Sequence, residues 1–133
     1  MQGVVDTKNF TRRKAPVLVY KELAQAVLPG WEISLVFVGE TRATNLNKAL
    51  RGKDYAPNVL SYVLDEKTKS GEIIICLTVA EHQAPSYELS YKNFVGLLYI
   101  HGLLHIKGLD HSDKMEKREQ ELMQKFVLAK VTP

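Results

Sequence analysis

The chain has 133 residues, of which 45% are hydrophobic and 25% charged, as expected of one soluble domain with a buried core. Its net charge of +3 permits a nucleic-acid partner without requiring one. The single cysteine, Cys76, excludes an internal disulfide and favours a reducing compartment. The first residues show no signal sequence, and the longest uncharged apolar stretch, residues 94–106, is too short to cross a bilayer. We therefore expect one cytoplasmic domain over residues 1–133 that has no membrane partner.

Four elements are predicted in the first half of the chain. Residues 14–28 carry an apolar stripe at helical spacing, which a Pro-Gly pair ends. Residues 32–38 alternate as a strand does. A short helix is expected over residues 41–50, with Thr41 as its N-cap, and a second strand over residues 58–64.

The second half predicts a buried centre. Residues 73–77 form a continuous apolar run, typical of a strand buried on both faces, and a short helix is expected over residues 78–84. Residues 90–107 are apolar nearly all round, which predicts a buried helix that ends at Gly108. A last amphipathic helix is expected over residues 112–129, with its first residue as the cap. Strands interleaved with helices indicate an α/β or α+β sandwich.

Three of the four histidines fall in one eleven-residue window with the spacing HxxxHxxGxxH. Because residues i and i+4 share a helix face, His101 and His105 project side by side, and we expect both rings to point toward the interior or into a cleft. Gly108 then turns the chain, so that His111 can return to the same point. Three ring nitrogens and a fourth position for water are the arrangement expected of a catalytic zinc site.

Two other interpretations of this cluster remain. The histidines could be core residues satisfied by local hydrogen bonds, although two adjacent imidazoles on a buried helix need several polar partners. The site could also be a closed structural zinc site, with Asp110, Asp113 or Cys76 as its fourth ligand. For Asp110 we favour a role in the turn or in orienting an imidazole. The three-histidine set would also hold nickel, copper or iron.

Gly102 stands where the protease motif HExxHxxGxxH carries its glutamate general base. A glycine cannot abstract a proton, so the pattern disfavours a peptidase. Gly102 either leaves the helix surface open beside the metal for a substrate, or only relieves helix packing.

Basic residues gather in two other segments. Residues 46–54 carry three of them at a predicted helix end, where a solvated loop is the ordinary explanation. The functional alternative is a phosphate contact by Arg51, whose planar guanidinium can bind two phosphate oxygens and stabilise transition-state charge. A second basic cluster over residues 8–14 could follow an RNA backbone or be merely solvated.

Residues 101–111 read HGLLHIKGLDH, residues 46–54 read LNKALRGKD, and residues 71–76 read GEIIIC. These segments resemble, in order, HGxLHLxGYDH, LNxxYRxKD and GDIxIC of the YbeY family of bacterial endoribonucleases. The resemblance runs from about residue 31 onward. One departure is Leu109, which replaces the tyrosine usual in that family.

The resemblance implies an α+β fold, with a mixed β-sheet of about four strands packed with helices and a zincin-like metal site on a central helix. It implies one Zn2+ ion held by His101, His105 and His111 plus water, with Arg51 acting on the phosphate. It also implies cleavage of single-stranded RNA, maturation of the 3′ end of 16S ribosomal RNA on the small ribosomal subunit, and a role in ribosome quality control.

The expected reaction is metal-assisted phosphodiester hydrolysis, in which zinc lowers the pKa of its bound water to about 7 or polarises a phosphoryl oxygen. The general base is open, and either zinc hydroxide or the RNA 2′-OH is the nucleophile. A 2′,3′-cyclic phosphate product would exclude direct attack by water as the first step. The alternative functions are a metallohydrolase of another substrate, including peptides, and a non-catalytic, zinc-stabilised factor that binds the ribosome.

Overall fold

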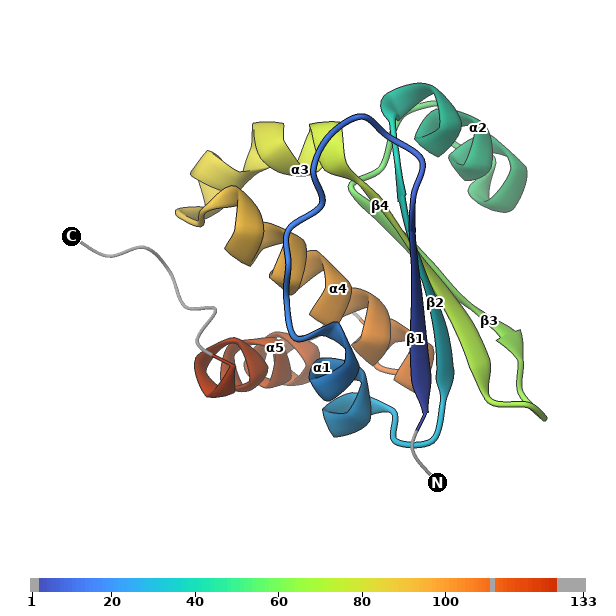
Figure 1. Cartoon of the computed structure of the whole chain (residues 1–133), viewed down its shortest axis with the longest axis vertical. Helices are drawn as coiled ribbons and strands as arrows, with labels where there is room; N and C mark the ends of the chain where they lie inside the picture. Colours follow the sequence, from blue (N-terminus) through green and yellow to red (C-terminus); the bar gives the residue numbers. More distant parts are fainter. Residues whose placement is uncertain (1–2, 111, 127–133) are drawn as a thin grey trace.

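The computed structural model describes residues 3–110 and 112–126, and its centre is a four-stranded sheet with helices on both faces (Figure 1). The strands lie in the spatial order β1-β2-β4-β3. Strands β1, β2 and β4 are parallel, and β3 pairs with β4 in the antiparallel direction at one edge. The expected α+β class with a mixed sheet of four strands is therefore confirmed. The strand bounds are β1 (Val4–Asn9), β2 (Glu32–Val38), β3 (Val59–Asp65) and β4 (Ser70–Cys76).

The helices divide unequally between the two faces of the sheet. Figure 1 shows α2 on one face, and α1, α4 and α5 on the other. None of the described helices is long and apolar enough to cross a membrane. The helix bounds are α1 (Tyr20–Val27), α2 (Glu40–Arg51), α3 (Leu77–Gln83), the short 3-10 helix η1 (Ala84–Tyr87), α4 (Tyr91–Lys107) and α5 (Asp113–Lys125).

Strand β4 is buried on both faces, as its apolar run predicts. Ile73 and Ile75 face the larger core, to which α1 and α4 contribute, whereas Ile74 and Cys76 face a smaller cluster beneath α2. The strand begins earlier than expected, at Ser70, because antiparallel pairing with β3 extends it toward the turn. Leu77 begins α3 instead of ending the strand.

Helix α4 runs through the core, which confirms the prediction from its apolar surface. The Ser90 hydroxyl caps its first turn by accepting a hydrogen bond from the Asn93 backbone N–H at 3.1 Å. Its last turn ends at Gly108, whose φ of 107° is in the region that favours glycine. The predicted bounds of this helix therefore hold to within one residue.

The N-terminal region differs from the sequence prediction. Strand β1 is not predicted, because its residues are mostly polar and exposed, and it is held by pairing with β2 at one edge of the sheet. Helix α1 begins at Tyr20 and not at residue 14, since the residue before Pro16 is disfavoured in helical conformation. The Pro16 carbonyl instead accepts a hydrogen bond from the Tyr20 hydroxyl at 2.7 Å.

Two predictions about helix ends also need correction. Helix α2 begins at Glu40, so its N-cap is Gly39 and not Thr41, and no side chain caps it. Helix α5 begins after Ser112, as expected, but ends at Lys125. Residues 127–129, to which the prediction extends, lie outside the described residues.

Candidate metal centre

Helix α4 carries His101 and His105 one turn apart, as their spacing predicts. The side chain of His101 is 25% exposed and lines a cavity of about 510 Å³ whose walls come from η1, α4 and the start of α5. His105 is exposed and contacts the edge strand β3. The expectation of a cleft is therefore confirmed for His101, whereas an interior position for His105 is wrong, because its side of α4 lies at the margin of the sheet.

The His101 ring is held by a carboxylate from α5. Its Nδ1 lies 2.6 Å from Oε2 of Glu119, whose side chain is only 14% exposed. An ionised carboxylate only accepts hydrogen bonds, so with Glu119 in that form the proton is on Nδ1, which donates it. In the neutral ring, that proton leaves the lone pair on Nε2, which is the form that binds a metal.

The His105 ring is held by a hydroxyl from β3. Its Nδ1 lies 2.9 Å from Oγ of Ser61, which can donate or accept. Ser61 lies two residues from each of Val59 and Val63, which pack against the larger core. When Nδ1 donates to Ser61, the lone pair of this second ring is also on Nε2.

The donor set fits a borderline divalent cation such as zinc. Metal-bound histidines almost always donate their other ring N–H to a nearby acceptor, and both His101 and His105 have such a partner. No group of three His, Cys, Asp or Glu side chains that could hold a metal occurs within residues 3–110 and 112–126. A three-ligand site at these histidines therefore requires a residue beyond those ranges. His111, the predicted third ligand, lies outside the described residues and stays a prediction.

The closed structural site loses one of its candidate ligands. Cys76 is buried with the cluster beneath α2, on the opposite face of the sheet from α4. Burial raises the pKa of its thiol, which disfavours the thiolate that zinc requires. Asp113 lines the cavity beside His101 and stays a candidate, and Asp110 is exposed in the turn after α4.

The environment of Gly102 decides between its two interpretations. Gly102 is buried, and a Cβ atom built on it would lie 3.0 Å from Cγ2 of Ile73 on β4. Gly102 therefore faces the sheet, and the suggestion that it leaves the helix open to a substrate is wrong. The glycine lets α4 approach β4 closely, and β4 fills the space into which a glutamate would extend.

Arg51 is not brought into this cavity. It is the exposed last residue of α2, and Gly52 follows it with a φ of 67°. Helix α2 packs on the opposite face of the sheet from α4, and Arg51 is not among the residues that line the cavity beside His101. The connection from α2 leads directly into β3, the strand that contacts His105.

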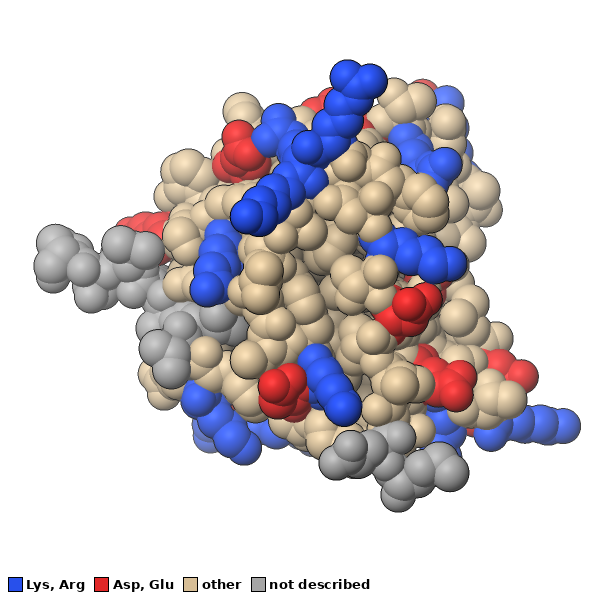
Figure 2. All heavy atoms as spheres, in the orientation of Figure 1, with Lys and Arg blue, Asp and Glu red and all other residues tan. Residues whose placement is uncertain are grey.

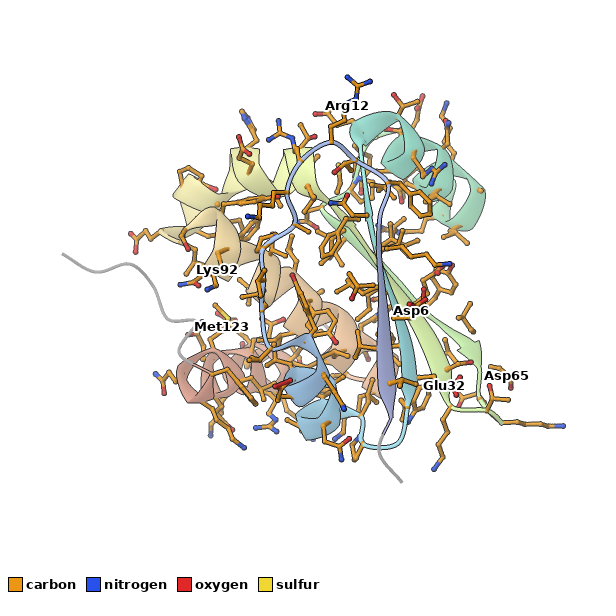
Figure 3. The ribbon with its side chains drawn as sticks, in the orientation of Figure 1. Asp6, Arg12, Glu32, Asp65, Lys92 and Met123 are labelled. Carbon is orange, nitrogen blue, oxygen red and sulfur yellow. The ribbon has the colours of Figure 1, made fainter. Side chains whose placement is uncertain are left out.

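The basic cluster over residues 8–14 favours the solvated interpretation. Arg13 pairs with Glu81, and Figure 3 shows Arg12 projecting away from the body of the molecule. Asp6 lies on the adjoining strand (Figure 3). Figure 2 shows a run of Lys and Arg side chains across the top of the molecule with acidic side chains beside it, and single basic side chains near acidic ones lower down. The Arg13–Glu81 pair and the outward direction of Arg12 are those of an exposed, solvated cluster.

Sequence reasoning missed both side chains that hold the imidazoles. One signal could have found Glu119. It follows Met115 by four residues and precedes Leu122 by three, so it occupies the apolar stripe of an amphipathic helix. Ser61 has no comparable signal, because its contact with His105 depends on how β3 packs beside α4.

Comparison with known proteins connects this geometry to a family. A family model described as endoribonuclease YbeY matches residues 3–132. Endoribonuclease YbeY of Aromatoleum aromaticum is 32% identical over 130 residues, which cover 97% of this chain and 84% of the relative. Endoribonuclease YbeY of Helicobacter pylori is 36% identical over 121 residues, which cover 89% of this chain and 86% of the relative.

A solved structure has a similar fold. The solution structure of a Thermotoga maritima protein superposes with a TM-score of 0.61 at 25% identity, covering 80% of this chain and 75% of that one. The family model and the curated relatives both span most of the chain. The chain therefore belongs to the YbeY family of endoribonucleases.

Proposed function

We propose that this protein is a zinc-dependent endoribonuclease that cleaves single-stranded RNA, matures the 3′ end of 16S ribosomal RNA and acts in ribosome quality control on the small subunit. Family membership supports an RNA-hydrolysing enzyme. The observation that carries the metal assignment is the pair His101 and His105, which stand one turn apart and each have Nδ1 within hydrogen-bonding distance of a partner.

His101 and His105 would hold the ion through Nε2, with His111 as the third ligand. When bound, the zinc ion supplies Lewis acidity, which activates water and polarises a phosphoryl oxygen. The hydrogen bond to Glu119 would select the His101 tautomer whose lone pair is on Nε2 and would hold the ring in one orientation. Glu116 and Glu119 both line the cavity beside His101, so a carboxylate is available there to accept a proton.

Arg51 would bind the phosphate at the reaction centre. Arg51 immediately precedes the connection into β3, and Ser61 of β3 contacts His105. An RNA strand lying across the edge formed by β3 would therefore reach Arg51 from one side and the histidines from the other. The forked guanidinium suits two phosphate oxygens and the charge that develops on them.

The peptidase alternative is weaker because of Gly102. In the protease motif the glutamate at this position is the general base, and here β4 occupies the space into which such a side chain would extend. A screen with fluorogenic peptides is expected to show no cleavage. Peptide cleavage that needs the same histidines would favour a metallohydrolase of another substrate.

The central experiment measures bound zinc and cleavage of single-stranded and duplex RNA for wild type, His105→Ala and Arg51→Ala. Wild type is expected to bind one zinc ion and to cleave only the single strand. His105→Ala is expected to lose both activities. Arg51→Ala is expected to keep the zinc and to lose about 10²-fold or more in rate, as when a charge-stabilising donor is removed from an active site.

Two matched controls come from the same chain. His82→Ala removes an exposed histidine from α3. Arg42→Ala removes an exposed arginine of α2 that lies nine residues before Arg51, and so on the opposite side of the helix and about 13 Å along it. Both are expected to behave as wild type, with circular dichroism verifying folding. Wild type that holds zinc but never cleaves RNA would indicate the non-catalytic ribosome-binding factor, and wild type without metal would refute the proposal.

A further inference from the structure

We infer that Glu119 of α5 and Ser61 of β3 are positioning residues for the metal centre, each fixing one imidazole of α4 so that its Nε2 faces a shared ion. The inference rests on the proposed function, because it requires a metal at His101 and His105. It goes further by assigning the orientation of the ligands to side chains on two other elements of the fold.

The environment of Glu119 argues for a specific role. Its carboxylate is largely buried and occupies the apolar stripe of α5, between Met115 and Leu122. Burying a charged group is costly unless a partner compensates it, and the partner here is Nδ1 of His101 at 2.6 Å. Glu121, two residues further on, is exposed and pairs with Arg118 on the surface.

Ser61 is likewise a polar residue at a position that faces the core, here on the sheet. It is a polar residue between Val59 and Val63, on the face of β3 that packs against the larger core. Its hydroxyl lies 2.9 Å from Nδ1 of His105. Ser34, a serine of β2, bonds Glu72 instead, and its neighbour Val36 packs with the cluster on the other face.

These two contacts restrict the rotation of the two imidazole rings about χ2. The χ2 torsion of a histidine is broad and roughly two-fold, so a ring without a partner samples orientations that turn Nε2 away from its neighbour. Glu119 is 18 residues from His101 and Ser61 is 44 residues from His105, so the folded core sets both rings before a metal binds. A carboxylate partner also makes the ring a more basic ligand.

The chemistry of the two partners predicts unequal effects. Hydrogen bonds to an ionised group are roughly twice as strong as those between neutral groups. Loss of the Glu119 carboxylate should therefore weaken zinc binding more than loss of the Ser61 hydroxyl. Glu119→Gln keeps a carbonyl oxygen that can accept from Nδ1 but removes the charge, so it should fall between wild type and Glu119→Ala.

The test measures zinc dissociation constants by competition with a chromophoric chelator. We expect Glu119→Ala to bind zinc about 10- to 100-fold more weakly than wild type, with smaller losses for Glu119→Gln and Ser61→Ala. The zinc dissociation constants of the matched controls should stay within about twofold of the wild-type value, because Glu121 pairs with Arg118 and Ser34 bonds Glu72. The controls are Glu121→Ala, Glu121→Gln and Ser34→Ala. Circular dichroism and thermal unfolding of the metal-free proteins separate an effect on the site from an effect on the fold.

X-ray absorption of the zinc proteins identifies the ligands directly. If Glu119 only positions His101, wild type and Glu119→Gln should show the same set of imidazole ligands. An oxygen ligand present in wild type and lost in Glu119→Gln would make Glu119 a ligand and overturn the inference. Tight zinc binding by wild type together with unchanged affinity in folded Glu119→Ala would overturn it while leaving the proposed function intact. Wild type that binds no zinc would refute both.

Discussion

At the scale of single residues, Gly102 stands where the protease motif HExxHxxGxxH carries its glutamate. Its missing side chain lets α4 lie against β4, where a Cβ atom would stand 3.0 Å from the fully buried Ile73. Gly71 makes a second close approach, since a Cβ there would lie 2.9 Å from Cδ1 of Ile106. The two glycines therefore set how closely the histidine-bearing helix packs on the sheet.

Gly102→Ala is expected to lower the free energy of unfolding. Overpacking against Ile73 costs about 1–3 kcal/mol, and the better helix propensity of alanine returns up to about 1 kcal/mol. The net loss of about 1 kcal/mol can be measured by urea denaturation of the metal-free protein. A variant more stable than wild type would show that Ile73 can yield to the methyl group.

At the scale of elements, α5 connects the proposed metal centre to the rest of the fold. Its first turn is capped by Ser112, whose hydroxyl accepts from the Met115 backbone N–H at 3.4 Å. Its buried face carries Glu119 between two core residues. The position of this helix therefore determines where the carboxylate that contacts His101 lies.

Ser112→Ala is expected to cost about 1 kcal/mol of stability, because it removes the side-chain cap of α5. Urea denaturation measures this loss. Hydrogen exchange should show that, relative to wild type, the substitution speeds amide exchange more in the first turn of α5 than in α4. Ser86→Ala is the matched control, since that exposed hydroxyl bonds the Gln83 carbonyl. Equal stability of Ser112→Ala and wild type would contradict a role for the cap.

The elements also show where sequence reasoning succeeds. The strand over residues 32–38 has the predicted bounds, because alternating burial leaves a period of two in the sequence. The sequence also predicts a helix over residues 90–107, observed over residues 91–107, because a buried helix is apolar on all sides. Strand β1 had no such signal, since pairing with β2 defines it.

At the scale of the whole molecule, the proposed centre joins three elements distant in sequence. The histidines come from α4, and their partners come from α5 and β3. A ligand that binds only the folded state stabilises it by mass action. A metal at this point would therefore stabilise the sheet edge and the last helix together.

Removal of metal is expected to destabilise the protein. Zinc at 100 times its dissociation constant adds about 2.7 kcal/mol, which corresponds to a rise of several degrees in the unfolding temperature. Thermal unfolding followed by circular dichroism, with zinc and with a chelator, measures this shift. His82→Ala should keep the shift and His105→Ala should lose it. Identical unfolding temperatures for wild type in the two conditions would contradict a metal centre.

Local periodicity, which repeats every two or 3.6 residues, is enough to predict the buried central helix and the neighbouring positions of His101 and His105. The same periodicity left α/β and α+β both open, and the family resemblance favoured α+β. The folded structure was needed to show that Gly102 faces β4, that Cys76 lies across the sheet from α4, and that His101 and His105 each have a hydrogen-bond partner. Those facts depend on contacts between residues far apart in the chain, for which a local pattern carries no signal.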